Sequence, residues 1–299
     1  MTKLNCILVG HSFFPDGDVA VRSAAVLAQK TNALLYLLHV VEPYPLYQQM
    51  RFPTAPAHAM LEEVVLMMRT RLNDLTAQPE LSGLQVETDA HIGKPFVEIL
   101  RTARSWNANL VVVGVSQRGE GRFLGSTGER VLRKSQVPVL LAKRELSSGP
   151  KTVLIPVDFS ECAKQAAQEG ISVVRGFGGR AIFVHVMDLA SYVYPATYGA
   201  LPISIPPLTP EDIEPDWQHF LQGLSLEGIT WDKQTREGRA APGVVDAARE
   251  CNADLIVIGT HGRTGVAHML LGSVAEAVLR LTDCSVMTVR PDAFRFELP

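Results

Sequence analysis

The chain has 299 residues, of which 46% are hydrophobic and 20% charged, and its formal net charge is -3 at pH 7. This composition is typical of a globular protein and excludes a disordered chain, and the length suffices for about two domains. A weak negative charge gives no electrostatic reason to bind a polyanion, so no nucleic-acid partner is expected.

The N-terminal sequence predicts neither a targeting segment nor a membrane segment. Its apolar run breaks at His11 and Pro15, too early for a secretory or membrane-spanning helix. Four cysteines occur without any C-x-x-C spacing, at Cys6, Cys162, Cys251 and Cys284. Scattered cysteines argue against a disulfide framework and against a zinc ribbon. We therefore expect a cytoplasmic protein with reduced thiols and no membrane contact.

The first half alternates short β-rich runs with longer helical stretches, which predicts parallel βαβ units. The predicted strands are Cys6–Gly10, Leu34–Val40, Val86–Ile92, Leu110–Val113 and Val139–Leu141. A proline-rich stretch, "EPYPLYQQMRFPTAPAH", follows the second strand. It is too long for a simple connection, so we expect a lid or a contact surface.

The second half shows the same alternation. Its predicted strands are Thr152–Val157, Ala181–Val186, Ile229–Glu237, Leu255–Ile258 and Ser285–Val289. The segments "PGVVDAARECNA" and "SVAEAVLRLT" carry apolar residues at helical spacing. A second proline-rich stretch, "LASYVYPATYGALPISIPPLTPED", again follows the second strand. The nearly continuous apolar strands favour a sheet covered on both faces.

Corresponding landmarks of the two halves keep an almost constant separation. His39 is matched by His185 after 146 residues, and Gly114 by Gly259 after 145 residues. Separations this constant indicate an internal repeat. We therefore expect two domains joined by a short polar linker near "ELSSGP", with bounds 1–144 and 151–299.

A glycine-rich stretch, "GTHGRTGVAHMLLGSVAEAVL", begins at Gly259 directly after an apolar strand. Ligands of parallel sheets bind beyond such strand ends. We expect Gly259 to permit close backbone approach, and Gly262 and Gly265 to adopt positive φ. Gly272 and the following serine open a helix whose free N–H groups suit phosphate oxygens. The spacing is not that of a Walker A loop, because no lysine stands at the helix start.

The spacing G-x2-G-x9-G-S, after an apolar strand with a D-L-I-V run, resembles the nucleotide signature of the universal stress protein family, specifically its ATP-binding branch. The resemblance covers both halves, so the chain is identified as a tandem member. It implies an α/β fold in which each domain has a five-stranded parallel sheet of order 3-2-1-4-5 between helices. It also implies that the last strands of the two domains pair to form a pseudo-dimer within one chain. Further association of chains stays open.

The resemblance, carried over position by position, implies one nucleotide site in the second domain. Asp158 would lie near the adenosine moiety, Val186 would flank the adenine, and the helix start at Gly272 would hold the phosphates. The implied set is Pro156, Val157, Asp158, Val186, Ile258, Gly259, His261, Gly262, Arg263, Gly272, Ser273 and Val274. The implied ligand is ATP, and an accompanying magnesium or manganese ion stays open.

The first domain departs from this signature. His11 is taken to stand in the place of Asp158, and Gln117 stands in the place of Gly262. The loop 114–125 is also two residues shorter than its counterpart. We therefore predict a degenerate first domain and one good nucleotide site per chain.

Simpler interpretations compete with these assignments. Asp158 is also a candidate N-cap of the following helix, a role for which Ser160 competes. His39 and His185 are expected to be oriented by packing and not to bind a metal.

Three hypotheses about function follow. The leading one is an ATP-binding stress-response module with a regulatory or sensory role and an unknown protein partner. The chain contains no nucleophile elbow, no H-E-x-x-H motif and no Walker lysine, so catalysis is at most slow ATP hydrolysis. The alternatives are a slow ATPase and a structural or chaperone-like pseudo-dimer that binds no nucleotide.

Overall fold

The structure, a computed structural model, describes residues 4–43, 55–115, 126–188, 209–262 and 271–291. Most of both proline-rich stretches lies outside these residues, so their role as lids or contact surfaces stays a prediction.

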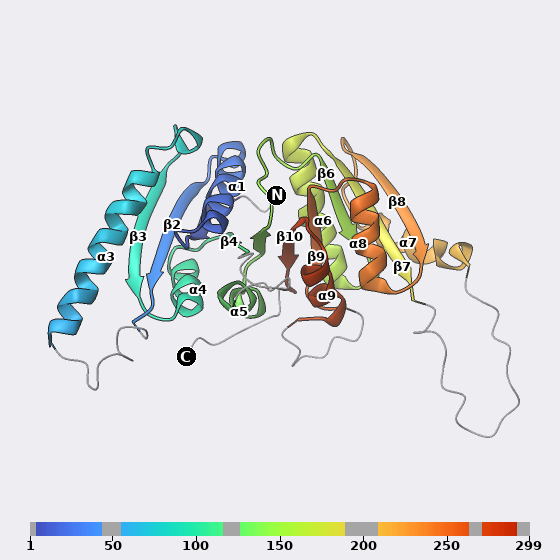
Figure 1. The fold of residues 1–299 in the computed structure, drawn as a ribbon. Helices are drawn as coiled ribbons and strands as arrows, with labels where there is room; N and C mark the ends of the chain where they lie inside the picture. The colour runs from blue at the N-terminus through green and yellow to red at the C-terminus, as the bar shows by residue number, and fades with distance from the viewer. Residues whose placement is uncertain (1–3, 44–54, 116–125, 189–208, 263–270, 292–299) are drawn as a thin grey trace, which may run out of the picture.

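The strands of the described residues form one continuous sheet in the order β3-β2-β1-β4-β5-β10-β9-β6-β7-β8 (Figure 1). In the first domain they are β1 Cys6–Gly10, β2 Leu34–Val41, β3 Val86–Ile92, β4 Leu110–Gly114 and β5 Val139–Ala142. In the second they are β6 Thr152–Pro156, β7 Arg180–Met187, β8 Thr230–Glu237, β9 Leu255–Gly259 and β10 Ser285–Val289. Each domain has the predicted order 3-2-1-4-5, but the two five-stranded sheets are fused into one.

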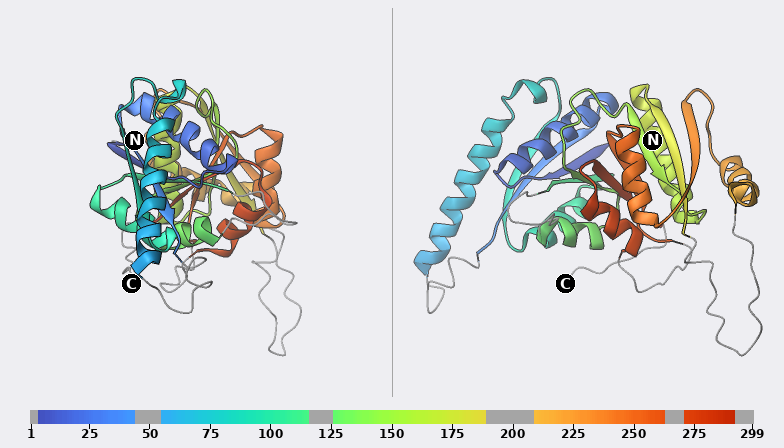
Figure 2. Two further views of the ribbon diagram at one scale, coloured as in Figure 1. Left: turned by 60° about the vertical axis from the view of Figure 1, so that its left-hand side comes forward. Right: turned by 45° about the vertical axis from the view of Figure 1, so that its right-hand side comes forward.

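Helices cover both faces of this sheet (Figure 2). On one face lie α1 Pro15–Thr31, α3 Ala55–Leu75, α6 Glu161–Phe177 and α7 Glu214–Gln222. On the other lie α4 Pro95–Ser105, α5 Ser126–Lys134, α8 Ala240–Glu250 and α9 Ser273–Leu281. Short 3-10 turns cover Pro79–Leu81 and Pro210–Ile213. Among the described residues, no helix has the length and apolar character needed to span a bilayer.

The two domains are joined by antiparallel pairing of β5 with β10, as predicted for a pseudo-dimer. Leu140 lies opposite Met287 and Leu141 opposite Val286 in this ladder, and all four residues are buried. The two large hydrophobic cores, one on each face of the sheet, both contain residues of both domains. The pairing covers two strand edges that would otherwise expose unpaired N–H and C=O groups.

Charged side chains repeat across the pseudo-two-fold axis between α5 and α9. Arg133 lies 2.9 Å from Glu276, and Arg280 lies 3.9 Å from Glu129. Each arginine also pairs with the glutamate of its own helix, at 3.1 and 3.0 Å. Because these side chains are about one third exposed, each pair adds only a few tenths of a kcal/mol to about 1 kcal/mol.

Two cations after the central strands cap helices of the opposite domain. Lys143 donates to the carbonyl oxygens of Leu279 and Thr282 at the end of α9. Arg290 donates to the carbonyl oxygen of Leu132 in α5 at 2.7 Å. Burial lowers the pKa of Arg290 to about 10, so the guanidinium stays charged at neutral pH. A cation at a helix C-terminus is favourable because it meets the negative end of the helix dipole.

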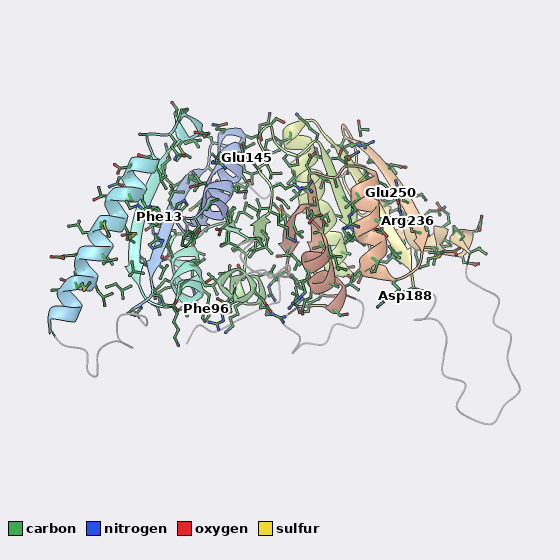
Figure 3. The ribbon with its side chains drawn as sticks, in the orientation of Figure 1. Phe13, Phe96, Glu145, Asp188, Arg236 and Glu250 are labelled. Atoms are coloured by element: carbon green, nitrogen blue, oxygen red, sulfur yellow. The ribbon has the colours of Figure 1, made fainter. Side chains whose placement is uncertain are left out.

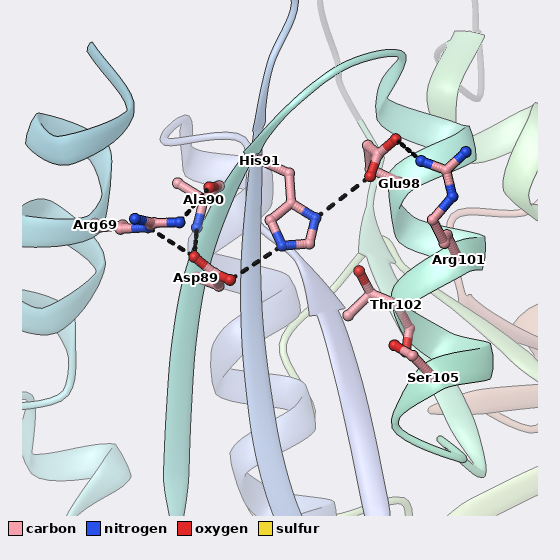
Figure 4. A network of polar contacts seen from close by, with 8 residues as sticks. All are labelled: Arg69, Asp89, Ala90, His91, Glu98, Arg101, Thr102 and Ser105. Carbon is pink, nitrogen blue, oxygen red and sulfur yellow. Dashed lines mark hydrogen bonds and ion pairs between the residues drawn. The ribbon is translucent and has the colours of Figure 1, made fainter. Parts of the chain in front are cut away.

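Polar side chains connect the outer strands of the sheet to the flanking helices. In Figure 4, His91 of β3 lies between two carboxylates, 3.0 Å from Asp89 and 3.4 Å from Glu98 of α4. At the opposite edge, Arg236 of β8 lies 2.6 Å from Glu250 of α8 (Figure 3). Charged side chains on edge strands discourage pairing with a further chain.

Glycines at the ends of β4 and β9 let the neighbouring helices cross the sheet closely. A Cβ atom at Gly114 would lie 2.0 Å from the carbonyl oxygen of Asp16 in α1. A Cβ atom at Gly259 would lie 2.9 Å from Sγ of Cys162 in α6. The clash at Gly114 is with backbone and cannot be relieved by a rotamer change.

We predict that Gly114→Ala destabilises the protein by more than about 2 kcal/mol, because α1 must move away from β4. The matched control is Gly176→Ala in α6, where a Cβ atom meets nothing within 4 Å. This control should gain up to about 1 kcal/mol from the better helix propensity. Urea unfolding measures both, and equal stabilities of the two variants would contradict the packing argument.

Candidate functional site

The sheet of the second domain opens between β6 and β9. These strands have two register pairs among the described residues, Val153 with Leu255 and Leu154 with Ile256. The equivalent strands β1 and β4 keep four pairs, as far as Gly10.

Pro156 explains this difference. The backbone N–H and C=O groups of even-numbered residues of β6 point toward β9. The carbonyl oxygen of Thr152, for example, accepts from Asp254 N at 2.9 Å. Pro156 is therefore the next residue that should donate to β9, and proline has no N–H. Gly10 occupies this place in the first domain, so only the second domain loses the ladder there.

A cavity of about 240 Å³ lies where the two strands part. From this point α6 leaves β6 toward one face of the sheet, and α9 leaves β9 toward the other. Such a divergence of crossovers beyond strand carboxyl ends is the usual ligand site of an open parallel sheet.

The structure brings the predicted site residues together around this cavity. Eleven of the twelve line it: Pro156, Val157, Asp158, Val186, Ile258, Gly259, His261, Gly262, Gly272, Ser273 and Val274. The twelfth, Arg263, lies outside the described residues.

Seven further lining residues were not predicted: Ala163, Val184, His185, Ala240, Val244, Thr260 and Ala275. Thr260 and Ala275 stand inside the glycine-rich stretch, so their positions could have been inferred from its spacing. Val244 was identified only as an apolar residue of a helix, because periodicity does not show which end of a helix faces a ligand.

Asp158 and Ser160 have separate roles at the start of α6. Ser160 is the N-cap, and its Oγ accepts from the Ala163 N–H at 3.1 Å. Oδ1 of Asp158 accepts from Ser160 N at 3.1 Å and from Ser160 Oγ at 2.6 Å. The N-cap interpretation of Asp158 is therefore wrong. These two bonds hold the carboxylate in place at the cavity wall.

Gly262 is a glycine because a carboxylate lies against it. A Cβ atom there would lie 2.7 Å from Oδ2 of Asp158. Its φ is outside the left-handed range, so the predicted positive φ is wrong for this residue. Gly265 lies outside the described residues, and its positive φ stays a prediction.

Buried Thr260 connects the cavity wall to α9 and to the central strands. Its N–H donates to Val289 at the end of β10 at 2.9 Å, and its carbonyl oxygen accepts from Gly272 N at 2.7 Å. Gly272 is the N-cap of α9 and supplies no side-chain cap. The first N–H groups of α9, including that of Ser273, are thus suited to an anion at the cavity.

The register of the first domain corrects one assignment made from the sequence. His11 N donates to the carbonyl oxygen of Leu38 at 2.8 Å, just as Val157 N donates to the carbonyl oxygen of Val184 at 2.8 Å. His11 is therefore equivalent to Val157 and does not stand in the place of Asp158.

Ser12 is the residue equivalent to Asp158. Its Oγ accepts from Phe14 N at 3.3 Å, as Oδ1 of Asp158 accepts from Ser160 N. A hydroxyl thus replaces the carboxylate. The sequence comparison of the two halves had matched Asp158 to His11, one residue too early. Residue 117 and the loop 116–125 lie outside the described residues, so the other departures of the first domain stay predictions.

Other hollows of the molecule are lined by different residues. One of about 490 Å³ is lined by Lys151, Asp254 and Cys284, which precede β6, β9 and β10. Another of about 390 Å³ includes Leu4 and Asn109, which precede β1 and β4. Neither is lined by Asp158 or by the glycine-rich stretch, so both are weaker candidates than the cavity beside Pro156.

The fold is a tandem α/β fold with a cavity at a strand switch point of the second domain. The model of the universal stress protein family matches residues 4–143 and 149–290. The chain belongs to this family, with two tandem domains.

Relatives with the same tandem length support this assignment. The chain is 28% identical to a universal stress protein of Mycolicibacterium smegmatis over 307 residues, which cover 95% of this chain and 97% of the relative. It is also 28% identical to universal stress protein Rv2623 of Mycobacterium tuberculosis, with 95% and 96% covered. A solved universal stress protein of Archaeoglobus fulgidus has the same fold, with a TM-score of 0.74, 21% identity, and 96% and 99% covered.

Two histidines of the first domain make stability depend on pH. Burial lowers the pKa of His11, although Asp18 at 3.2 Å acts in the opposite direction. Burial also lowers the pKa of His39, although its Nδ1 hydrogen bond to the carbonyl oxygen of His11 favours the charged form. The unfolded chain therefore binds protons at higher pH than the folded chain.

We predict that the free energy of unfolding falls as the pH drops below about 6.5, by up to about 1.4 kcal/mol per pH unit for each histidine. His39→Asn, which does not titrate, should lose less stability between pH 7.5 and 5.5. His219→Asn, at an exposed position of α7, is the control and should behave as wild type. Urea unfolding at both pH values is the measurement, and an unchanged pH dependence in His39→Asn would count against the argument.

Proposed function

We propose that the cavity of the second domain binds ATP, and that the chain is a regulatory or sensory module of the stress response. The observation that carries this proposal is the convergence of eleven residues, named in advance from the resemblance, on one cavity. Chance would not place residues from four separate segments of the chain around the same opening of a sheet.

The lining chemistry fits an adenine nucleotide. Apolar side chains such as Val157, Val184 and Val244 suit the faces of a base. The Asp158 carboxylate offers an acceptor to sugar hydroxyls, and the start of α9 offers N–H donors to phosphate oxygens. The missing Cβ of Gly262 leaves room beside the carboxylate.

A divalent cation would depend mainly on the nucleotide. No group of three or more histidine, cysteine or acidic side chains is placed to hold a metal among the described residues. Magnesium is usually bound through substrate phosphates and retained water, and this mode suits the cavity. We therefore propose magnesium or manganese as a companion of the phosphates only.

Contacts between the cavity and the domain boundary favour a regulatory role. Thr260 in the cavity wall is hydrogen-bonded to Val289, and the next residue, Arg290, holds the end of α5 in the first domain. Nucleotide that fixes the 260–262 segment would thereby bias the packing of the central strands. An unidentified protein partner would bind differently to the protein with and without nucleotide. A second copy of the chain is not required for this effect.

We predict that ATP in hundredfold excess over its Kd adds about 2.7 kcal/mol to the free energy of unfolding and raises the Tm by several degrees. Gly262→Gln should abolish this shift, because its side chain would occupy the space beside Asp158. Differential scanning fluorimetry measures the shift. Absence of any shift with adenine nucleotides in the wild type would refute the proposal.

Ser12→Ala provides the matched control, since Ser12 is the first-domain equivalent of Asp158. It should keep the full ATP shift, whereas Asp158→Asn should lose most of it. Phosphate release in the same samples separates binding from slow hydrolysis. Loss of the shift in Ser12→Ala would place the nucleotide in the first domain instead.

A further inference from the structure

The backbone of β7 continues past the end of β6. The backbone N–H and C=O groups of even-numbered residues of β7 point toward β6. Arg180 N donates to the carbonyl oxygen of Lys151 at 2.8 Å, and the carbonyl oxygen of Val184 accepts from Val157 N. Odd-numbered residues face β8, since the carbonyl oxygen of Met187 accepts from Gly238 N at 3.0 Å. The N–H of Val186 therefore points toward β6, on the side of the cavity.

The ladder between β6 and β7 stops one rung early. In a regular parallel ladder, Val186 N would donate to the carbonyl oxygen of Val157. Among the backbone bonds of the described residues this rung is absent. The carbonyl oxygen instead accepts from Nδ1 of His185 at 2.7 Å. Because a carbonyl oxygen only accepts, Nδ1 carries the proton.

Aromatic packing holds the imidazole in this position. The ring of Phe159 lies 4.5 Å from that of His185, and the ring of Trp217 lies 6.4 Å from it. Phe159 has φ 61°, so the chain turns sharply after Asp158. Trp217 is itself fixed by a 2.8 Å bond from Nε1 to Oγ1 of Thr235. The imidazole is thus fixed from the face of the sheet that carries α6 and α7.

The first domain contains the same arrangement. Nδ1 of His39 donates to the carbonyl oxygen of His11 at 2.8 Å, and the rung from Val40 N is again absent from the described backbone bonds. Phe13 has φ 56°, and its ring lies 4.7 Å from that of His39 in a tilted arrangement. The repeat therefore offers an internal control that has the same hydrogen bond but the degenerate signature.

We propose that His185 is a positioning residue for base recognition. By occupying the carbonyl oxygen of Val157, it keeps the N–H of Val186 out of the ladder and available to a nucleobase in the cavity. An N–H donor pairs with an unprotonated ring nitrogen, such as N1 of adenine. Guanine carries a proton at N1, so two donors would face each other. The inference rests on the proposed function and adds the source of its selectivity for the base.

Leaving a buried donor unpaired costs about 1–3 kcal/mol, which corresponds to a preference of about 5- to 150-fold for ATP over GTP. His185→Leu frees the carbonyl oxygen of Val157 to accept Val186 N, and we expect this preference to fall by at least tenfold. His185→Asn keeps an N–H donor near the place of Nδ1 and should restore it. Isothermal titration with ATP and GTP gives both affinities.

The matched control is His39→Leu, which removes the same bond and packing from the first domain. It should lose similar stability and keep the wild-type ratio of ATP to GTP affinity. A purely structural role for His185 would lower both affinities equally in His185→Leu. An unchanged ratio in that variant would overturn the inference.

Amide hydrogen exchange of the full chain tests the same inference without any nucleotide. In the wild type, Val186 N–H should exchange at least tenfold faster than Val184 N–H, and in His185→Leu it should be slowed by at least tenfold. Equal protection of these two amides in the wild type would overturn the inference, even if His185→Leu fails to fold. Because this result does not depend on ligand, it separates failure of the inference from failure of ATP binding.

Discussion

The antiparallel pairing of β5 with β10 is the constraint on which the molecule depends. A parallel five-stranded sheet leaves an open edge, and each domain uses its last strand to close the edge of the other. Because the ladder is buried, the two hydrophobic cores become continuous across the domain boundary. Lys143 and Arg290 then cap helices of the opposite domain at equivalent places. The end of β10 is therefore in direct contact with both halves of the molecule.

The candidate site follows from a local interruption of this regular sheet. Pro156 cannot continue the ladder to β9, and His185 takes the carbonyl oxygen that would continue the ladder to β7. Both interruptions occur at the carboxyl end of β6, so a cavity forms there while the rest of the strand stays fully paired. In the first domain Gly10 removes one interruption and His39 keeps the other. This difference supports an unequal role of the two copies.

Much of this architecture was predictable from the chain alone. The strands were placed within one or two residues, since the central strands are short apolar runs bounded by polar turns and the strand pattern repeats in both halves. The site residues were predicted through their resemblance to a family signature, and those within the described residues surround one cavity. The errors concern contacts between segments: His11 was matched to Asp158 one residue too early, and Gly262 was assigned a positive φ in place of a close approach to a carboxylate.

The amino-acid sequence by itself determined the repeat, the alternation of strands and helices, and the positions of the glycines, because these depend on composition and spacing along the chain. The end of the ladder between β6 and β9 is also recorded in the sequence, because Pro156 has no N–H. Tertiary structure alone decided how the ladder between β6 and β7 ends. There the imidazole of His185 donates to the carbonyl oxygen of Val157, and the rings of Phe159 and Trp217 pack beside it. These residues are distant in sequence, so no local sequence pattern predicts that their side chains are in contact.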